Sequence, residues 1–291
     1  MCQSLRRQMK RRFLFMSGEW SVSVPLVLQD ESWMHTNIAR EIVKNPDGSY
    51  ARLNIRENLE GLIYYASVDN EKLRRSNLER LARENVPCWP NPGKLRMLDD
   101  RFEVLKRCVD AGLVDHEVNF VTFGTLPHSR RPERPYVLKI GNTHQGEGKI
   151  LITSYEDEQA LPPWEGIASV EPFFVGESYR VLFIGSDEFL LRYVNDESWI
   201  KNSLGADVEQ LDISSMSKSF LDVIAHARKV RDLFDLEVCG IDYVVDEHEK
   251  FHFLEYNCFP GVGTSEEIAS SAKRLFRQKM DIVVSEANSR T

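Results

Sequence analysis

The feature that constrains this chain most is a pair of apolar segments near its C-terminal end, separated by a short polar connection. The first covers residues 238–245, the second 251–256, and the polar connection lies at 246–250. Apolar runs of this length, rich in β-branched and aromatic residues, favour strands, and a short polar connection favours an antiparallel hairpin. The pattern therefore predicts two neighbouring strands of an antiparallel sheet.

Three oxygen-bearing side chains lie in this hairpin. Asp242 interrupts the apolar first strand, and Glu255 and Asn257 stand two residues apart at the end of the second. A charge inside an apolar strand is costly unless it is paired or bound to a metal, and period two places residues 255 and 257 on one face. Such oxygens suit Mg²⁺, with Mn²⁺ as an alternative. Spacing alone equally allows a solvated face of an antiparallel hairpin.

A second constellation surrounds Lys139, which ends an apolar strand predicted at 136–140. The segment 141–148 that follows is rich in glycine, and 149–153 returns as an antiparallel strand. A lysine next to such a loop can bind phosphate, because backbone N–H groups unblocked by Cβ atoms close over the oxygens. The segment is not a Walker A loop, and an ordinary hairpin turn with a lysine at the strand edge is the alternative.

Apolar patterns elsewhere alternate between strand and helix spacing, which predicts a mixed α/β (α+β) fold. Further strands are expected at 120–123, 168–174, 179–184 and 189–193, and helices at 95–111 and 217–234.

The N-terminal part predicts a small α/β unit of its own. Strands are expected at 12–16 and 61–67, followed by a helix at 70–84 with Asp69 as its N-cap. Three prolines and a glycine within 86–93 predict a linker. We therefore expect an N-terminal domain at 1–93 and a second domain at 94–291.

Length and composition limit the function classes. A chain of 291 residues exceeds one efficient core and suits two or three subdomains with a cleft between them. The net charge of −8 argues against nucleic-acid binding, although 6–12 form a short basic run. No segment has the ~20 apolar residues that cross a membrane. Five scattered cysteines suit free thiols, so we expect a cytoplasmic protein.

Two arginines and the segment after them complete the candidate set. Arg180 and Arg192 stand on consecutive predicted strands, followed by Lys201 and Asn202. Arginines so placed can hold a phosphoryl group or a substrate carboxylate, and surface salt bridges are the alternative.

Other reaction classes lack support in the sequence. His248 and His252 are four residues apart, but on a hairpin this spacing does not bring them together, so a zinc site is not expected. The sequence contains no G-x-S-x-G elbow, dinucleotide fingerprint or H-E-x-x-H motif. Nucleophilic hydrolases and dehydrogenases are therefore not favoured.

Together these segments resemble the ATP-grasp superfamily, in the branch that holds RimK-type ligases, glutathione synthetases and synapsins. The resemblance extends from about residue 94 to the last helix. In chain order, the segments that carry it are LDDRF at 98–102, PYVLK at 135–139, HQGEGK at 144–149, VEPFF at 170–174, YRV at 179–181 with Gly185, WIKN at 199–202, GID at 240–242 and LEYNCFPG at 254–261.

The resemblance implies an ATP-grasp fold: an N-terminal pre-ATP-grasp α/β domain, then a small lobe at about 120–175 and a large lobe at about 176–291 that clasp ATP. The hinge at 170–174 would meet adenine, although Pro172 lacks an N–H. The nucleotide-binding residues implied are Lys106, Lys139, Gln145, Gly146, Gly148, Glu171, Phe173, Phe174 and Lys201.

For the reacting end of the site, the resemblance implies metal ligands and catalytic groups. Asp242, Glu255 and Asn257 would bind Mg²⁺. Arg180, Arg192 and Asn202 would act on the substrate.

Two classes of function follow from the resemblance. As an enzyme, the chain would use ATP to phosphorylate a carboxylate of a small-molecule, amino-acid or peptide substrate, and an amine would then displace phosphate. The alternative is a synapsin-like regulatory protein that binds ATP without ligase activity, or an ATP-grasp phosphotransferase. Neither nucleic acid nor a membrane is an expected partner, and a homo-oligomer is left open.

Overall fold

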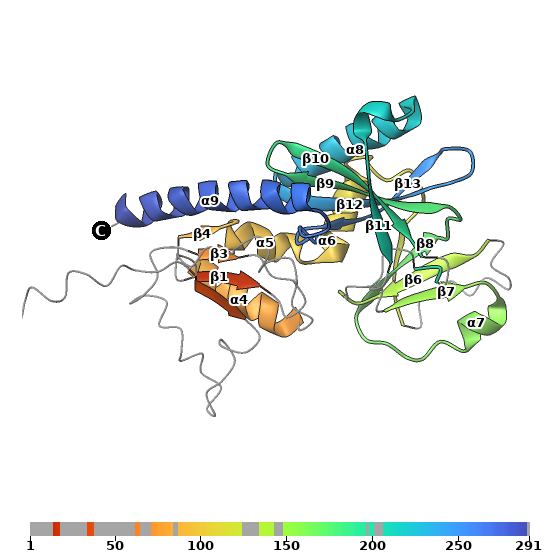
Figure 1. Cartoon of the computed structure of the whole chain (residues 1–291). Coiled ribbons are helices and arrows are strands. Elements are labelled where there is room, and N and C mark those ends of the chain that lie inside the picture. Colours follow the sequence, from red (N-terminus) through yellow and green to blue (C-terminus); the bar gives the residue numbers. More distant parts are fainter. Residues whose placement is uncertain are drawn as a thin grey trace, which may run out of the picture. The chain divides into compact units, whose positions relative to one another are not determined.

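The computed structural model describes residues 14–17, 34–37, 62–64, 71–83, 87–123, 134–142, 148–195, 198–200 and 206–289. The chain divides into two compact units, one made of Met1–Arg96 with Gly261–Thr291 and the other of Met97–Pro260. Figure 1 labels the elements of both. The division into domains at 93/94 stays a prediction, and each unit is considered by itself.

The first unit contains a four-stranded parallel sheet in the order β2-β1-β3-β4. The predicted strands near 12–16 and 61–67 and the helix at 70–84 are confirmed, whereas β2 was not predicted and Asp69 lies outside the described residues. The elements of this unit are β1 (Leu14–Ser17), β2 (Met34–Asn37), β3 (Leu62–Tyr64), α4 (Glu71–Arg83), β4 (Cys88–Trp89) and the long helix α9 (Glu266–Ser289), which contacts β3 and β4.

The proline-rich segment that was predicted as a linker contains regular structure. Cys88 and Trp89 form the edge strand β4, and the Trp89–Pro90 peptide bond is cis. Helix α5 (Pro92–Leu98) begins directly at the third proline, which the first turn of a helix tolerates because its N–H has no partner there. The Trp89 ring packs edge-on against Phe276 of α9, 5.7 Å between centroids. The segment is therefore part of the first unit's packed structure.

The second unit begins with a helix that differs from its prediction. Instead of one helix at 95–111, the chain forms α5 and then α6 (Arg101–Asp110). The side chain of Asp100 accepts hydrogen bonds from the backbone N–H groups of Phe102 and Glu103, and so caps a new helix. This interruption places Arg101 at the first position of α6.

A four-stranded antiparallel sheet forms the smaller layer of the second unit, in the order β5-β8-β6-β7. One face holds a core of Val121, Leu138 and Ala168. A short helix, α7 (Tyr155–Gln159), was not predicted and begins at a capping box made by Ser154 and Asp157. The four predicted strands are confirmed as β5 (Asn119–Thr122), β6 (Tyr136–Ile140), β7 (Lys149–Ile152) and β8 (Ile167–Pro172).

A five-stranded antiparallel sheet forms the larger layer, in the order β11-β10-β9-β12-β13. Helix α8 (Lys218–Phe234) packs on one face (Figure 1), where Phe220 meets the ring of Tyr179 and His226 bonds the hydroxyl of Tyr243 at 2.8 Å. The strands are β9 (Glu177–Ile184), β10 (Asp187–Val194), β11 (Asp207–Leu211), β12 (Val238–Val245) and β13 (Phe251–Asn257); β11 and the 3₁₀ turn Ile213–Ser215 were not predicted.

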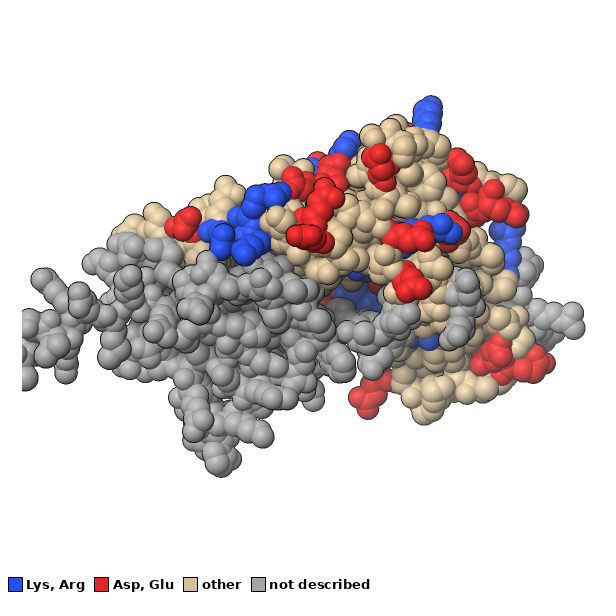
Figure 2. Space-filling view, viewed as in Figure 1, with Lys and Arg blue, Asp and Glu red and all other residues tan. Residues whose placement is uncertain are grey.

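The predicted mixed α/β class is confirmed by these layers. In the view of Figure 2, acidic and basic side chains are interspersed over the described surface. None of the helices within the described ranges combines the length and apolarity that crossing a bilayer requires.

Candidate functional site

The face of the large sheet opposite α8 brings the three predicted oxygen ligands together. Asp242 stands directly across from Glu255, and Asn257 stands across from Gly240, so all three side chains share this face. The amide of Asn257 donates to Asp242 Oδ2 at 2.9 Å. A register shift after Asp242 leaves Leu254 as a bulged residue, and bulges often re-aim strands next to functional sites.

Arg180 of β9 is bonded to this cluster from the neighbouring strand. Its Nε and Nη2 donate to the two carboxylate oxygens of Asp242 at 2.6 and 2.8 Å. Its guanidinium also lies 5.3 Å from the centre of the Tyr193 ring. Burial acts to lower the pKa of Arg180, but the Asp242 carboxylate outweighs it and holds that pKa above its ordinary range. Asp242, which is only 1% exposed, thus has the guanidinium of Arg180 as its buried partner.

Arg192 does not join Arg180. Arg180 pairs with Leu191 across β9 and β10, and Arg192 pairs with Tyr179. Because neighbouring residues of a strand point to opposite faces, Arg192 shares the face of Tyr179 and α8. There it donates to Glu177 at 2.6 Å and to Glu209 at 3.4 Å, and its side chain is 35% exposed. The structure thus places the two predicted arginines on opposite sides of the sheet.

Lys139 of β6 is buried and ion-paired. Its Nζ donates to Glu171 Oε2 of β8 at 2.5 Å and to the carbonyl of Leu254 at 3.4 Å. The hydroxyl of Ser169 donates to the other Glu171 oxygen at 2.7 Å. Burial acts to raise the pKa of Glu171, but Lys139 and Arg101 outweigh it and hold the pKa below its usual range. Lys139 and Glu171 thus form a buried ion pair on the small sheet, and the bond to Leu254 connects Lys139 to the large sheet.

Glu255 is neutralised by two cations from elsewhere in the unit. Lys149 Nζ, from β7, donates to Glu255 Oε2 at 3.1 Å, and Arg101 Nη2 lies 4.0 Å from the same oxygen. Burial would raise the pKa of Glu255, but Lys149, Arg101 and Lys139 outweigh it and lower the pKa. Glu255 therefore carries its negative charge in this site.

Arg101 was missed by the sequence analysis, which singled out Lys106 instead. Lys106 lies on the exposed side of α6 and lines no part of the pocket. Arg101 is directed into the site because Asn142 accepts from its backbone N–H at 3.1 Å and donates to the carbonyl of Asp99. The available signal was the pair Asp99–Asp100, since an aspartate at an N-cap marks the residue after it as the start of a helix.

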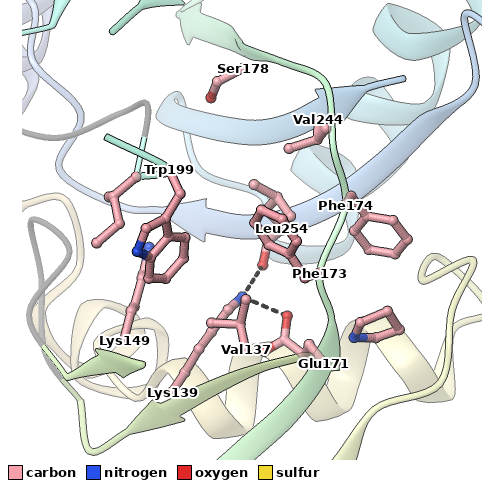
Figure 3. A pocket seen from close by; sticks show the side chains of 12 residues that line it. Val137, Lys139, Lys149, Glu171, Phe173, Phe174, Ser178, Trp199, Val244 and Leu254 are labelled. Atoms are coloured by element: carbon pink, nitrogen blue, oxygen red, sulfur yellow. Dashed lines mark hydrogen bonds and ion pairs between the residues drawn. The ribbon is translucent and has the colours of Figure 1, made fainter. Parts of the chain in front are cut away.

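A pocket of about 580 Å³, part of it open to solvent, is lined by three of these charged groups, Lys139, Lys149 and Glu171. In Figure 3 the side chain of Lys139 extends toward its centre, with Phe173 and Phe174 on one side and Trp199 and Lys149 on the other. Its size and largely apolar lining suit a small organic ligand. It is lined by Val137, Pro172, Phe173, Phe174, Trp199, Ile200, Val244 and Leu254, with Lys139, Lys149, Glu171 and Ser178 as polar members.

Aromatic contacts fix the side of the pocket that Phe173 and Phe174 form. Phe174 stacks on His252 with ring centroids 3.8 Å apart, and His252 in turn bonds Asp115 at 3.0 Å. The Phe173 ring meets Trp199 edge-on at 6.0 Å. The backbone N–H of Phe173 already donates to the carbonyl of Pro135 at 3.0 Å. Neither Trp199 nor His252 was among the predicted site residues.

The glycine-rich segment is described only at its base. Gly148 has a positive φ of 65°, and its carbonyl accepts from Ile140 N–H at 2.8 Å, which closes the hairpin of β6 and β7. Four predicted site residues, namely Gln145, Gly146, Lys201 and Asn202, lie outside the described residues.

The charges around the pocket are nearly balanced. Four cations (Arg101, Lys139, Lys149 and Arg180) face three carboxylates (Glu171, Asp242 and Glu255). Within the described ranges no three His, Cys, Asp or Glu side chains gather as a metal site. Two carboxylates and an amide nevertheless form an all-oxygen donor set that fits Mg²⁺ when other ligands complete its coordination. The surplus positive charge suits a polyanion such as a phosphate chain.

Of three comparisons with known proteins, the one with solved structures found matches. No protein-family model matches the sequence, and no curated protein matches it either. Among solved structures, D-alanine–D-alanine ligase from Bacillus anthracis matches with a TM-score of 0.66 at 10% identity, over 96% of this chain and 99% of that one. The same enzyme complexed with ATP matches with a TM-score of 0.66 at 10% identity, over 95% and 99%.

A third match is D-alanyl-alanine synthetase A from Vibrio cholerae, with a TM-score of 0.67 at 11% identity over 96% of this chain and 99% of that one. D-alanine–D-alanine ligases belong to the ATP-grasp superfamily. The predicted ATP-grasp fold is therefore confirmed.

Proposed function

We propose that this chain is an ATP-dependent, ADP-forming carboxylate–amine ligase. The observation that carries the proposal is the ladder of paired charges around one pocket: Lys139 with Glu171 on the small sheet, and Lys149 with Glu255 between the sheets. Such a site can neutralise a triphosphate and a metal at once, and the fold is shared with ligases, one of them complexed with ATP.

Each residue of the site is assigned a role from its position. Glu171, Phe173 and Phe174 would meet the adenine end, and Lys139 the phosphates, together with Gln145, Gly146 and Gly148 of the loop. Asp242, Glu255 and Asn257 would hold Mg²⁺ or Mn²⁺. When bound, this ion would neutralise phosphate oxygens and fix their orientation. Arg180 would keep Asp242 in place, and Arg192 has no part in this scheme because it lies on the other face.

The reaction needs positioning and charge neutralisation more than a protein nucleophile. A substrate carboxylate oxygen attacks the γ-phosphorus of ATP, and the bond to the bridging oxygen breaks to release ADP. An amine then attacks the carbon of the acyl phosphate and loses a proton as the carbon–oxygen bond to phosphate breaks. The products are an amide or peptide, ADP and phosphate. Arg101 and Lys149 lie beside Glu255, where they can stabilise the transferring charge.

The finer assignment is a RimK-type or glutathione-synthetase-like enzyme that acts on a small-molecule, amino-acid or peptide substrate in the cytoplasm. Its support is the order of sequence segments, in particular 240–242 and 254–261. We propose that the N-terminal domain helps to select the substrate, and that Asn202 and Lys201 contribute from the segment after Trp199.

One observation favours a second function, that of a synapsin-like regulatory protein that binds ATP without ligase activity. Trp199 and the hinge residue Phe173, from two synapsin-like segments, meet edge-on in the same pocket. The carboxylates at 242 and 255 favour the ligase, because phosphoryl transfer uses a metal. A phosphotransferase to a hydroxyl group is a third candidate.

The deciding experiment incubates purified protein with Mg²⁺, ATP and a pool of amino acids and peptides, and measures ADP, phosphate and new amides by mass spectrometry. We expect ADP, phosphate and an amide in equal amounts, and loss of all three in Glu255→Gln. Glu247→Gln is the matched control, since that side chain is 88% exposed on the β12–β13 turn. ATP binding without turnover would favour the regulatory function, and a phosphate ester would favour the phosphotransferase.

A further inference from the structure

Lys149 is hydrogen-bonded to Glu255, one of the proposed metal ligands. Its Nζ donates to Glu255 Oε2 at 3.1 Å, and its side chain is only 11% exposed. Within the described part of the chain, Lys149 supplies the single side-chain hydrogen bond to Glu255, because Arg101 stands back at 4.0 Å. A cation already stands at the oxygen to which the proposed function assigns a divalent ion.

The other two carboxylates of the site are bound differently. Asp242 receives two bonds from Arg180 and one from Asn257. Glu171 receives one bond from Lys139 and one from Ser169. Glu255 has the simplest attachment, one ammonium at the tip of a flexible side chain. Of the three pairs, Lys149–Glu255 is therefore the one that can exchange partners with the least rearrangement.

Lys149 also stands directly across from Lys139 on the paired strands β6 and β7. Two lysines opposite each other repel, and each of them has its own carboxylate in this structure. A metal ion that took Glu255 alone would leave the largely buried Lys149 ammonium without its partner, which is costly. A phosphate chain in the pocket would supply replacement oxygens, because Lys149 lines that pocket next to Trp199 (Figure 3).

From these contacts we propose that Lys149 competes with the divalent cation for Glu255, so that nucleotide binding uncovers the metal ligand. This proposal depends on the proposed function in one respect: a nucleotide and a metal ion are the ligands of this site. Its consequence is coupled binding: metal binds weakly without nucleotide, and by thermodynamic reciprocity the nucleotide binds weakly without metal. Lys149 is thus a positioning residue that couples the two ligands.

The test measures Mn²⁺ binding to the full chain by loss of the free-ion electron paramagnetic resonance signal, with and without a non-hydrolysable ATP analogue. In the wild type we expect the analogue to tighten Mn²⁺ binding by about tenfold or more, a common size for coupling between sites. Lys149→Met should bind Mn²⁺ about tenfold more tightly than the wild type when no nucleotide is present. The same variant should bind the analogue more weakly.

Three further variants locate the effect. Lys149→Arg keeps the positive charge beside Glu255, so Mn²⁺ binding without nucleotide should stay as weak as in the wild type. Lys229→Met removes a lysine charge from the exposed surface of α8, and Mn²⁺ binding should not change. Glu255→Gln in the Lys149→Met background should abolish the gain, which assigns the metal to Glu255.

The proposal is overturned if Lys149→Met binds Mn²⁺ no better than the wild type, or if the wild type binds Mn²⁺ equally well with and without the analogue. A misfolded variant would lose binding, whereas the expected result is a gain. If the gain occurs but no amide product is ever formed, the coupling stands and the ligase assignment fails. If an amide forms without the gain, the ligase stands and the coupling fails.

Discussion

Two buried ion pairs stand on the two sheets of the second unit, and they differ in how completely the protein satisfies them. On the large sheet, Arg180 binds both oxygens of Asp242 and lies against the Tyr193 ring. On the small sheet, Lys139 makes one short bond to Glu171 and a long one to a backbone carbonyl. Lys139 lines the pocket, and Arg180 does not.

This difference in hydrogen bonding indicates that Arg180–Asp242 supports the structure, whereas Lys139–Glu171 can contact a ligand. A bidentate guanidinium held in a fixed geometry has little capacity left for a substrate, so Arg180 chiefly holds the Asp242 carboxylate in its orientation. A lysine ammonium has three donors and a flexible stem, and it can turn to a phosphate without leaving its strand. We therefore expect the large-sheet pair to govern stability and the small-sheet pair to govern nucleotide affinity.

The largest expected effect is on the large sheet. Arg180→Met should lower the free energy of unfolding by about 3–5 kcal/mol, because it leaves the buried Asp242 carboxylate without its counter-ion. Guanidinium chloride denaturation measures the change. The double variant Arg180→Met with Asp242→Asn should recover much of the loss. A loss below about 1 kcal/mol in the single variant would show that the pair is not a structural element.

The next effect concerns the small sheet and appears in binding. Lys139→Met should weaken ATP affinity by about 10–100-fold, since a hydrogen bond to a charged group contributes about 1.5–3 kcal/mol. Isothermal titration calorimetry measures the dissociation constant. Adding Glu171→Gln removes the orphaned carboxylate and should restore stability without restoring affinity. Recovery of affinity in the double variant would contradict a direct phosphate contact.

A glycine beneath Arg180 provides a smaller test. A Cβ atom at Gly240 would lie 2.9 Å from Arg180 Cδ and 3.0 Å from Pro260 Cβ. Gly240→Ala should therefore cost about 1–3 kcal/mol in unfolding free energy by disturbing the bidentate contact. Gly261→Ala is the control, because no atom lies within 4 Å of its added Cβ, and its effect should stay within about 0.5 kcal/mol. Equal losses in the two variants would refute the close-packing argument.

The smallest effect belongs to the arginine on the other face. Arg192→Ala should change the unfolding free energy by less than about 1 kcal/mol, since its pairs with Glu177 and Glu209 are exposed. ATP affinity and product formation should equal those of the wild type. A tenfold loss of activity would return Arg192 to the catalytic set that the sequence predicted.

Several parts of this protein could be predicted from local sequence because their physical causes are local. The apolar runs on either side of a polar turn predicted β12 and β13 with their antiparallel pairing, and the period of two placed Glu255 and Asn257 on one face. The apolar strand before the glycine-rich segment predicted β6 and its return strand β7. The ATP-grasp fold was implied by the resemblance of these segments, in their order along the chain, to that superfamily.

The partners of these residues were decided only by tertiary structure. Arg180 and Arg192 look alike in sequence, but the register between β9 and β10 sends one to Asp242 and the other to the α8 face. Arg101 reaches Glu255 because Asp100 starts a new helix and Asn142, which lies 41 residues further along the chain, accepts from the backbone N–H of Arg101. Strand period fixes a side chain's direction only relative to its own strand. Register and packing across distant segments then decide which residue it meets.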